Sequence, residues 1–260
     1  MPKGDGELKC PWSMEFHDIG YQVFRNLIPL HIRSSAQEAV EKVCESIRTK
    51  EVVPSGVVYV SELKPHRNPG VDNTQAERVP FILGELPALS GCFKEFILQE
   101  SLWALAAEIL GSEDIVYHFS NVTRKPAYLG PNISWHRDYP NKYICPKDSR
   151  IFLRMLIPLE GMTKENGCTD AIAGSHLISD DAAIVEDERK SFAIDDPISL
   201  EGSAGDVIVI HPKLLHGGRE NRSSRERNLV VIQFGIKTDD YLYLDQELYS
   251  GLHQSEISGK

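Results

Sequence analysis

The feature that most constrains the fold is a series of short, β-prone apolar segments in the second half of the chain. They are separated by turn residues and read DIVYHFSNV, ISWH, IFLRMLIPL, DAIAG, ISL, DVIVIH and NLVVIQFGI. Short strands that follow one another without intervening helices are typical of a sandwich or a barrel. The sequence therefore predicts a mainly β fold with some α, whose β-barrel core covers about residues 113–240.

The first half of the chain has a helical pattern instead. Two segments, Gln37–Lys50 and Phe96–Leu110, place apolar side chains at helical spacing. A helix with one apolar face needs a surface against which to bury it, so the helical part, about residues 15–112, should pack on the barrel. We predict a single domain over residues 1–260, with a long and polar surface loop from Glu62 to Val79.

Composition argues against several classes of function. With 28 basic and 38 acidic residues the formal net charge is −10, which repels a phosphate backbone and argues against nucleic-acid binding. The five cysteines are widely spaced and odd in number, as expected for reduced thiols. The sequence shows no secretory signal, and no apolar run approaches the roughly 20 residues that span a bilayer. We expect a cytoplasmic protein that binds neither nucleic acid nor a membrane.

Three side chains form a candidate metal site. His136 and Asp138 are two residues apart, so in an extended segment both side chains point to the same face. A second histidine, His216, follows a buried strand that a Gly-Asp turn begins. Two histidines and one carboxylate occupy one face of an octahedral Fe(II) and leave three positions open. His211 competes as the distal ligand, although on a continuous strand it would face away from His216.

The open positions suit a 2-oxo acid and O2. Two positions accept the bidentate 2-oxo acid, and the third accepts O2. A 2-oxo diacid also needs a cation for its distal carboxylate, and an arginine binds a carboxylate through two parallel N–H groups. Arg227 follows His216 by eleven residues, at the head of the segment NLVVIQF. The residues therefore indicate Fe(II), with 2-oxoglutarate and O2 as cosubstrates.

The chain also resembles a known family over most of its length, from about residue 16 to residue 236. The matching stretches, in order, are Gly20-Tyr-Gln-Val-Phe, Leu110-Gly111, Arg124-Lys-Pro126, Trp135-His-Arg-Asp138, Asn166-Gly167, Gly174-Ser-His176, Gly205-Asp206, His216-Gly217, Asn221-Arg222-Ser223 and Arg227. Ordered motifs are far more specific than any single one. Together they resemble the phytanoyl-CoA dioxygenase family of Fe(II)/2-oxoglutarate oxygenases, and within it the ectoine hydroxylases most.

This resemblance implies a fold and a set of functional residues. The fold is a double-stranded β-helix, a jelly-roll or cupin-like barrel, with packed N-terminal helices. Iron is assigned to the same three side chains, and the distal carboxylate of 2-oxoglutarate to Arg227. The resemblance also implies that Thr169 touches 2-oxoglutarate. Thr123 stands where ectoine hydroxylases carry Asn, which places it in the cofactor shell.

Arg154 is the candidate substrate contact. It is the one charge in the apolar segment IFLRMLIPL, and a buried guanidinium needs an anionic partner. An inward Arg154 indicates an amino acid, another carboxylic acid or a specialised metabolite as substrate, whereas an outward one would be a solvated surface charge. We predict hydroxylation of an unactivated C–H bond of a small, anionic molecule, with release of succinate and CO2.

The sequence leaves several alternatives open. Desaturation or ring closure could replace hydroxylation, and the protein could be a monomer or a homodimer. An alternative from another class is a metal-binding, cupin-like sensor or structural barrel without 2-oxoglutarate chemistry. The fixed spacing between His216 and Arg227 argues against that alternative.

Overall fold

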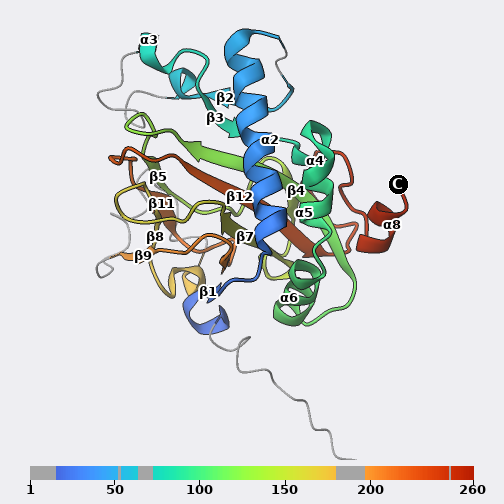
Figure 1. The fold of residues 1–260 in the computed structure, drawn as a ribbon. Helices are drawn as coiled ribbons and strands as arrows, with labels where there is room; N and C mark the ends of the chain where they lie inside the picture. Colours follow the sequence, from blue (N-terminus) through green and yellow to red (C-terminus); the bar gives the residue numbers. More distant parts are fainter. Residues whose placement is uncertain (1–15, 52–53, 64–72, 180–196, 246) are drawn as a thin grey trace, which may run out of the picture.

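Two facing β-sheets with helices on one outer side form the molecule, as the computed structural model in Figure 1 shows. The structure describes residues 16–51, 54–63, 73–179, 197–245 and 247–260. The predicted surface loop from Glu62 to Val79 lies in part outside these residues; its described part contains the short helix α3 (Asn73–Ala76). Most strands follow residue 113, but three strands of the larger sheet lie at residues 21–24, 57–59 and 80–83, within the part predicted to be helical.

The larger sheet has seven strands and is antiparallel throughout. Its order is β1-β10-β7-β12-β4-β3-β2, so neighbours in the sheet are mostly distant in sequence. The bounds are β1 (Tyr21–Phe24), β10 (Val207–Ile210), β7 (Phe152–Pro158), β12 (Arg227–Ile236), β4 (Ile115–Lys125), β3 (Pro80–Leu83) and β2 (Val57–Tyr59). Strand β12 pairs with β4 on one side and with β7 on the other, which makes it the centre of the sheet.

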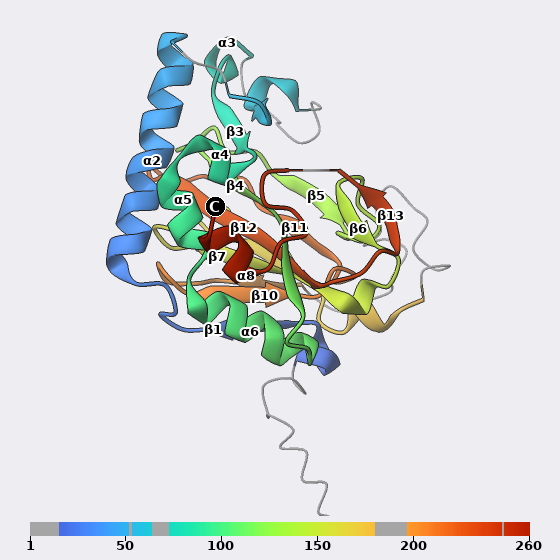
Figure 2. The ribbon, with the colours of Figure 1, turned by 90° about the vertical axis from the view of Figure 1, so that its right-hand side faces the viewer.

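The smaller sheet has four antiparallel strands in the order β5-β11-β8-β9. These are β5 (Ile133–His136), β11 (His216–Gly218), β8 (Thr169–Ala171) and β9 (Ile198–Leu200). A separate pair joins β13 (Tyr241–Leu244) to β6 (Ile144–Pro146). Figure 2 shows the smaller sheet on the side of the larger sheet that faces away from the helices. The predicted double-stranded β-helix is thus confirmed.

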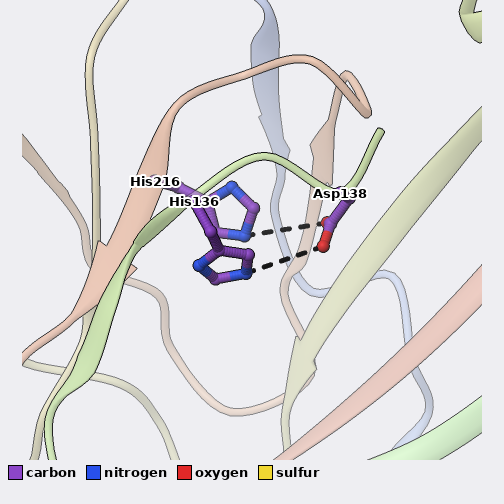
Figure 3. Close-up of side chains that lie close together, drawn as sticks. All are labelled: His136, Asp138 and His216. Carbon is purple, nitrogen blue, oxygen red and sulfur yellow. Dashed lines mark ion pairs between the residues drawn. The ribbon is translucent and has the colours of Figure 1, made fainter. Parts of the chain in front are cut away.

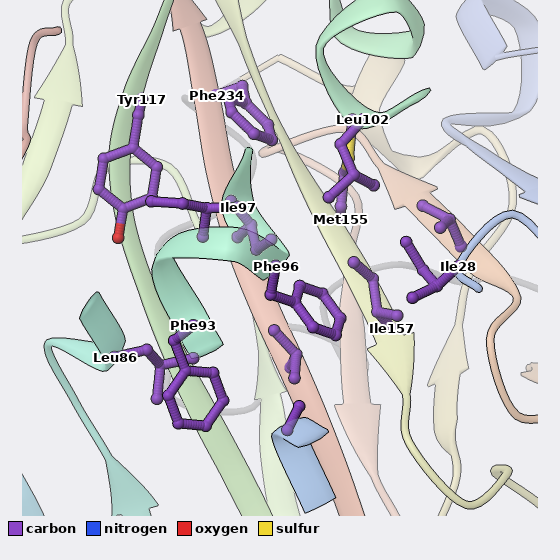
Figure 4. Packing of buried hydrophobic residues seen from close by; sticks show 14 of the residues in the cluster. Ile28, Leu86, Phe93, Phe96, Ile97, Leu102, Tyr117, Met155, Ile157 and Phe234 are labelled. Carbon is purple, nitrogen blue, oxygen red and sulfur yellow. The ribbon is translucent and has the colours of Figure 1, made fainter. Parts of the chain in front are cut away.

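The helices cover the opposite face of the larger sheet. They are α2 (Leu30–Thr49), α4 (Leu86–Leu89), α5 (Gly91–Ile97) and α6 (Glu100–Leu110). The remaining short helices are η1 (Val60–Glu62), η3 (Ser149–Ile151), η4 (Ser175–Leu177) and α8 (Gln254–Ser258). One hydrophobic core holds residues of α2, α5 and α6 together with residues of β4, β7, β10 and β12, and Figure 4 shows part of it. Among the described residues, no helix is long and apolar enough to cross a membrane.

Two predicted helices differ from the observed ones in their bounds. The helix expected at Gln37–Lys50 begins earlier, at Leu30, because Ile32 and Ala36 continue the buried stripe toward the N-terminus. The helix expected at Phe96–Leu110 is two helices with a break near Leu98. The indole nitrogen of Trp103 donates a hydrogen bond of 2.7 Å to the carbonyl oxygen of Ile97, which satisfies a free carbonyl at the end of α5.

The alternation of side chains along β12 separates the core from the interior between the sheets. Val230, Ile232 and Phe234 pack into the core beneath the helices. Leu229 and Val231, at the intervening positions, point between the two sheets. Because successive side chains of a strand alternate in this way, the same strand contributes both to the core and to a cavity. The shared core is consistent with the single domain predicted for residues 1–260, which stays a prediction.

Candidate metal centre and active-site cavity

The pairing of two short strands brings the candidate metal ligands together. Strands β5 and β11 are antiparallel neighbours, and His136 is the register partner of His216. Asp138 follows β5 by two residues, and its backbone N–H donates a hydrogen bond of 2.8 Å to the carbonyl oxygen of Pro212. That bond ties the chain after β5 to the loop that precedes β11. Figure 3 shows the three side chains converging on one point between the sheets.

The distances within this group fit a shared metal ion. His136 Nε2 lies 3.7 Å from Asp138 Oδ1, and His216 Nε2 lies 3.7 Å from Asp138 Oδ2. One ligand atom from each residue can be chosen so that all three lie within 4.8 Å of one another. Asp138 and His216 are buried, with exposed fractions of 5% and 7%. A carboxylate taken out of water in this way requires cationic partners or a metal.

Backbone carbonyls orient both imidazoles. His136 Nδ1 lies 2.8 Å from the carbonyl oxygen of Ser134, and His216 Nδ1 lies 2.8 Å from that of Leu214. A carbonyl oxygen only accepts, so each Nδ1 carries the hydrogen and each Nε2 presents its lone pair toward Asp138. Burial, followed by the nearby His216, lowers the pKa of His136 to about 4, so this imidazole is neutral at pH 7.

The group therefore meets the chemical requirements of an Fe(II) site. Two neutral imidazole nitrogens and one carboxylate form the donor set of a facial triad. Burial alone would raise the pKa of Asp138, but Arg154 and the two histidines outweigh burial and hold it below its ordinary value. Asp138 Oδ2 has no hydrogen-bond partner among the described residues. A metal ion would supply the partner that this buried oxygen lacks.

The competing ligand His211 lies elsewhere. Its ring stands 4.9 Å from that of His176 and 6.0 Å from that of Phe16, measured between centroids. Its Nδ1 accepts a hydrogen bond of 3.0 Å from the backbone N–H of Lys213. The structure thus brings His216, and not His211, to the other two ligands, as the expected strand geometry indicated.

A cavity of about 740 Å³ opens from the triad between the two sheets. The three ligands line it, as do four further residues that the sequence singled out: Arg227, Thr123, Thr169 and Arg154. The structure thus gathers every predicted site residue around one cavity, although these residues come from six different strands and one loop. A cavity of this volume is of the size that holds a small-molecule ligand.

Arg227 lines this cavity and is almost fully buried, with 1% of its surface exposed. Its Nη1 makes a weak contact of 3.9 Å with the sulfur of Met162. Its Nε and Nη2 atoms have no hydrogen-bond partner among the described residues. Burial lowers the pKa of Arg227 to about 10, so the guanidinium is still charged at pH 7. A buried cation with unused donors that borders a cavity is suited to bind an anion there.

Lys125 is a functional candidate that sequence reasoning missed. Its segment, Arg124-Lys-Pro126, contributes to the family resemblance without a predicted role, yet the lysine is fully buried and lines the cavity. Its Nζ donates a hydrogen bond to the carbonyl oxygen of Arg219. Burial, followed by the charge of Arg227, lowers the pKa of Lys125 well below its ordinary value. The alternation along β4 was the available signal, since Thr123 and Lys125 share one face.

The small residue at position 218 makes room for this lysine. A Cβ atom at Gly218 would stand 2.9 Å from Lys125 Nζ, closer than such contacts normally come. A larger residue at position 218 would therefore require the lysine side chain to shift.

The two threonines border the cavity without a firm polar contact to a charged group. Thr123 Oγ1 donates to Asn121 Oδ1 at 3.3 Å, and Thr169 Oγ1 lies 4.0 Å from the sulfur of Met162. Both hydroxyl groups lie in the same cavity as Arg227. Their contact with 2-oxoglutarate stays a prediction.

Arg154 faces inward, but the reason for assigning it to the substrate needs correction. We expected a buried guanidinium without a protein partner. Instead, Arg154 Nη1 donates a hydrogen bond of 2.5 Å to Asp138 Oδ1, and Arg154 Nε donates one of 3.3 Å to Gln233 Oε1. The charge is already balanced within the protein, so an anionic substrate no longer follows from it. A contact between Arg154 and the substrate stays a prediction, because the side chain lines the cavity.

Comparison with known proteins agrees with this geometry. The model of the phytanoyl-CoA dioxygenase (PhyH) family matches residues 17–229. The chain is 30% identical over 151 residues to a phytanoyl-CoA dioxygenase of Arabidopsis thaliana, covering 55% of this chain and 52% of that protein. The chain thus spans about half the length of the first curated relatives that it matches.

Solved structures share the fold. AviO1 from Streptomyces viridochromogenes Tue57 has a TM-score of 0.70 and 21% identity, over 87% of this chain and 94% of that one. EctD from S. alaskensis, solved with 2-oxoglutarate and 5-hydroxyectoine, has a TM-score of 0.68 and 18% identity, over 97% of this chain and 86% of that one. With a family match that covers most of its length, this chain belongs to the phytanoyl-CoA dioxygenase family.

Proposed function

We propose that this protein is a non-haem Fe(II)/2-oxoglutarate-dependent dioxygenase that hydroxylates an unactivated C–H bond of a small molecule. The main support for the proposal is that two buried charged groups with unpaired polar atoms line the same cavity. Among the described residues, Asp138 Oδ2 lacks a hydrogen-bond partner beside two imidazoles, and the Nε and Nη2 atoms of Arg227, which lines the same cavity, also lack partners. A metal ion satisfies the first group and the distal carboxylate of a 2-oxo diacid satisfies the second.

The residues that line the cavity would have different roles in binding. His136, Asp138 and His216 would hold Fe(II), which with 2-oxoglutarate and O2 supplies the oxidation of a C–H bond and releases succinate and CO2. Arg227 would bind the distal carboxylate of 2-oxoglutarate through its free donors. Lys125, the register partner of Arg227, would place further N–H donors beside it. Holding the cosubstrate at both ends orders it before reaction and removes the entropy cost of that ordering from the reactive step.

The substrate is proposed only as a small molecule of a size that fits the rest of the cavity. The anionic character predicted from the sequence depended on an unpaired Arg154, which pairs with Asp138. Glu85, Asp245 and Glu247 also line the cavity, as do Arg137 and Lys142, so its wall carries residues of both charges. Burial, followed by Glu85 and Asp245, raises the pKa of Glu247 to about 7. The cytoplasmic location and the monomeric or homodimeric state stay predictions.

Anaerobic spectroscopy tests the proposal directly. Fe(II) and 2-oxoglutarate added to the oxygen-free protein should give the weak visible charge-transfer band of the chelate, and exposure to O2 should convert 2-oxoglutarate to succinate. The band should be absent from His216→Ala and present in His211→Ala, which lies outside the triad. A protein that binds Fe(II) but neither shows the band nor consumes 2-oxoglutarate would be the metal-binding sensor or structural barrel instead.

A further inference from the structure

A chain of hydrogen bonds leads from Asp138 away from the imidazoles and into the larger sheet. Asp138 Oδ1 accepts from Arg154 Nη1 at 2.5 Å, and Arg154 Nε donates to Gln233 Oε1 at 3.3 Å. Gln233 Nε2 donates to the carbonyl oxygen of Ile144 at 2.7 Å and to His118 Nδ1 at 2.9 Å. None of these contacts is used in the binding of metal or 2-oxoglutarate proposed above.

The last hydrogen bonds of this series, those to Ile144 and His118, determine which way the amide of Gln233 faces. The carbonyl oxygen of Ile144 can only accept, so the amide nitrogen of Gln233 must point toward it and the amide oxygen toward Arg154. His118 is fully buried, and burial lowers its pKa to about 3, so its Nδ1 is available as an acceptor. Gly235 leaves room for this ring, since a Cβ there would lie 2.4 Å from His118 Cε1.

The guanidinium of Arg154 is held from three directions as a result. Asp138 and Gln233 bind its nitrogen atoms, and the ring of Phe119 lies under it, with the centroid 5.2 Å from Arg154 Cζ. Only 13% of the side chain is exposed, so few alternative rotamers are open to it. A guanidinium held in this way determines the position of the group to which it donates.

We propose that Arg154 is a positioning residue, which Gln233 orients, and that it occupies Asp138 Oδ1 so that the carboxylate offers Oδ2 to the metal. Both oxygen atoms lie 3.7 Å from an imidazole nitrogen, Oδ1 from His136 Nε2 and Oδ2 from His216 Nε2. They differ in hydrogen bonding, since among the described residues Oδ1 accepts from Arg154 and Oδ2 has no partner. An oxygen already engaged by a cation is the poorer metal ligand, so the carboxylate is set to bind through one oxygen. The inference rests on the metal site of the proposed function.

The direction in which metal affinity changes when Arg154 is replaced distinguishes this role from two others. Residues that orient metal ligands typically contribute 10–100-fold to metal affinity, so a positioning role predicts weaker binding when Arg154 is replaced. A purely electrostatic role predicts tighter binding, because a positive charge beside the metal is removed. A role in substrate binding alone predicts unchanged metal affinity in the absence of substrate.

The experiment is an anaerobic Co(II) titration of the purified protein without 2-oxoglutarate or substrate, followed by calorimetry and by the visible spectrum of Co(II). We expect Arg154→Met to bind Co(II) roughly 10–100-fold more weakly than the unmodified protein, with an altered spectrum. Gln233→Leu keeps the arginine but releases its orientation, and should give a smaller loss of the same sign. Lys142→Met is the matched control, since it removes another cation from the cavity lining without a contact to Asp138.

The outcomes distinguish the inference from the function on which it rests. If the unmodified protein binds no Co(II) that depends on His216, the metal site itself is wrong. If the unmodified protein binds Co(II) and Arg154→Met binds it equally or more tightly with the same spectrum, the positioning role is overturned. Circular dichroism of each variant establishes that it is folded, and Arg154→Lys provides a second variant that keeps the charge but not the two-sided fork.

Discussion

Replacement of Arg227 by Met should lower the affinity for 2-oxoglutarate and at the same time stabilise the protein without ligands. The guanidinium is almost fully buried, and its Nε and Nη2 atoms have no partner among the described residues. At 1.36 kcal/mol for each pH unit, the fall of its pKa from 12.5 to about 10 corresponds to about 3 kcal/mol. Both folded and unfolded states carry the charge at pH 7, so burial of this charge destabilises the folded state there.

Met has a similar length and no charge, so Arg227→Met removes that cost. We expect the free energy of unfolding of the apoprotein to rise by about 1–3 kcal/mol at pH 7, the lower figure allowing for imperfect packing. The ligand affinity should change in the opposite direction. Loss of one partner from a buried ion pair costs about 3–5 kcal/mol, which is roughly 100- to 4,000-fold in the dissociation constant. The lower end applies here because Lys125, the register partner of Arg227, keeps N–H donors beside the same site.

Two measurements on the same preparations test whether stability rises and whether the affinity for 2-oxoglutarate falls. Chemical denaturation gives the free energy of unfolding of the apoprotein, and anaerobic calorimetry on the Mn(II)-loaded protein gives the affinity for 2-oxoglutarate. Lys125→Met serves as the companion variant, because it removes the amino group of the register partner of Arg227. An affinity for 2-oxoglutarate within threefold of the unmodified protein would refute the role of Arg227, provided that Mn(II) still binds. A destabilised apoprotein with normal 2-oxoglutarate binding would show that Arg227 serves the fold.

Further predictions concern the ligands, the reaction and the pH dependence. His136→Ala, Asp138→Ala and His216→Ala should each lose nearly all Fe(II)-dependent consumption of 2-oxoglutarate, whereas His211→Ala should keep measurable iron binding; the reverse pattern for His211 and His216 would show that the distal ligand is misassigned. Because the carboxylate of Asp138 leaves no position for a halide beside the chelate and O2, products formed in high chloride should contain no chlorine by mass spectrometry. His118 has a folded-state pKa of about 3 against an ordinary value of 6.5, so its contribution to stability is present above pH 6.5 and is lost as the pH falls toward 3. At pH 5 the loss is about 2 kcal/mol, and the free energy of unfolding of His118→Asn should fall less steeply over this range than that of the unmodified protein.

Much of the fold followed from local patterns. The apolar runs NLVVIQFGI and DVIVIH predicted strands that the structure has as β12 and β10. The break near Leu98 was not predicted, because the apolar stripe continues through it. At the end of α5 the carbonyl oxygen of Ile97 accepts a hydrogen bond from Trp103 of the next helix, a contact that depends on how that helix packs. Helix continuity was therefore a tertiary property here.

The chemistry of the site divides in the same way. Residue types and spacing by themselves determined that His136 and Asp138 share one face and that a histidine and an arginine follow at the ends of later strands. These are properties of one chain segment at a time, and they were enough to predict the metal and the cosubstrate.

Only the tertiary structure decided which of these side chains meet. The pairing of β11 with β5 brings His216 to His136, and the pairing of β12 with β4 places Lys125 directly opposite Arg227. Arg154 was predicted to need an anion, and the sequence could not show that Asp138 supplies it. The physical reason is that such contacts depend on the register between strands that are distant in sequence, and a shift of one residue would turn each side chain to the opposite face of its sheet.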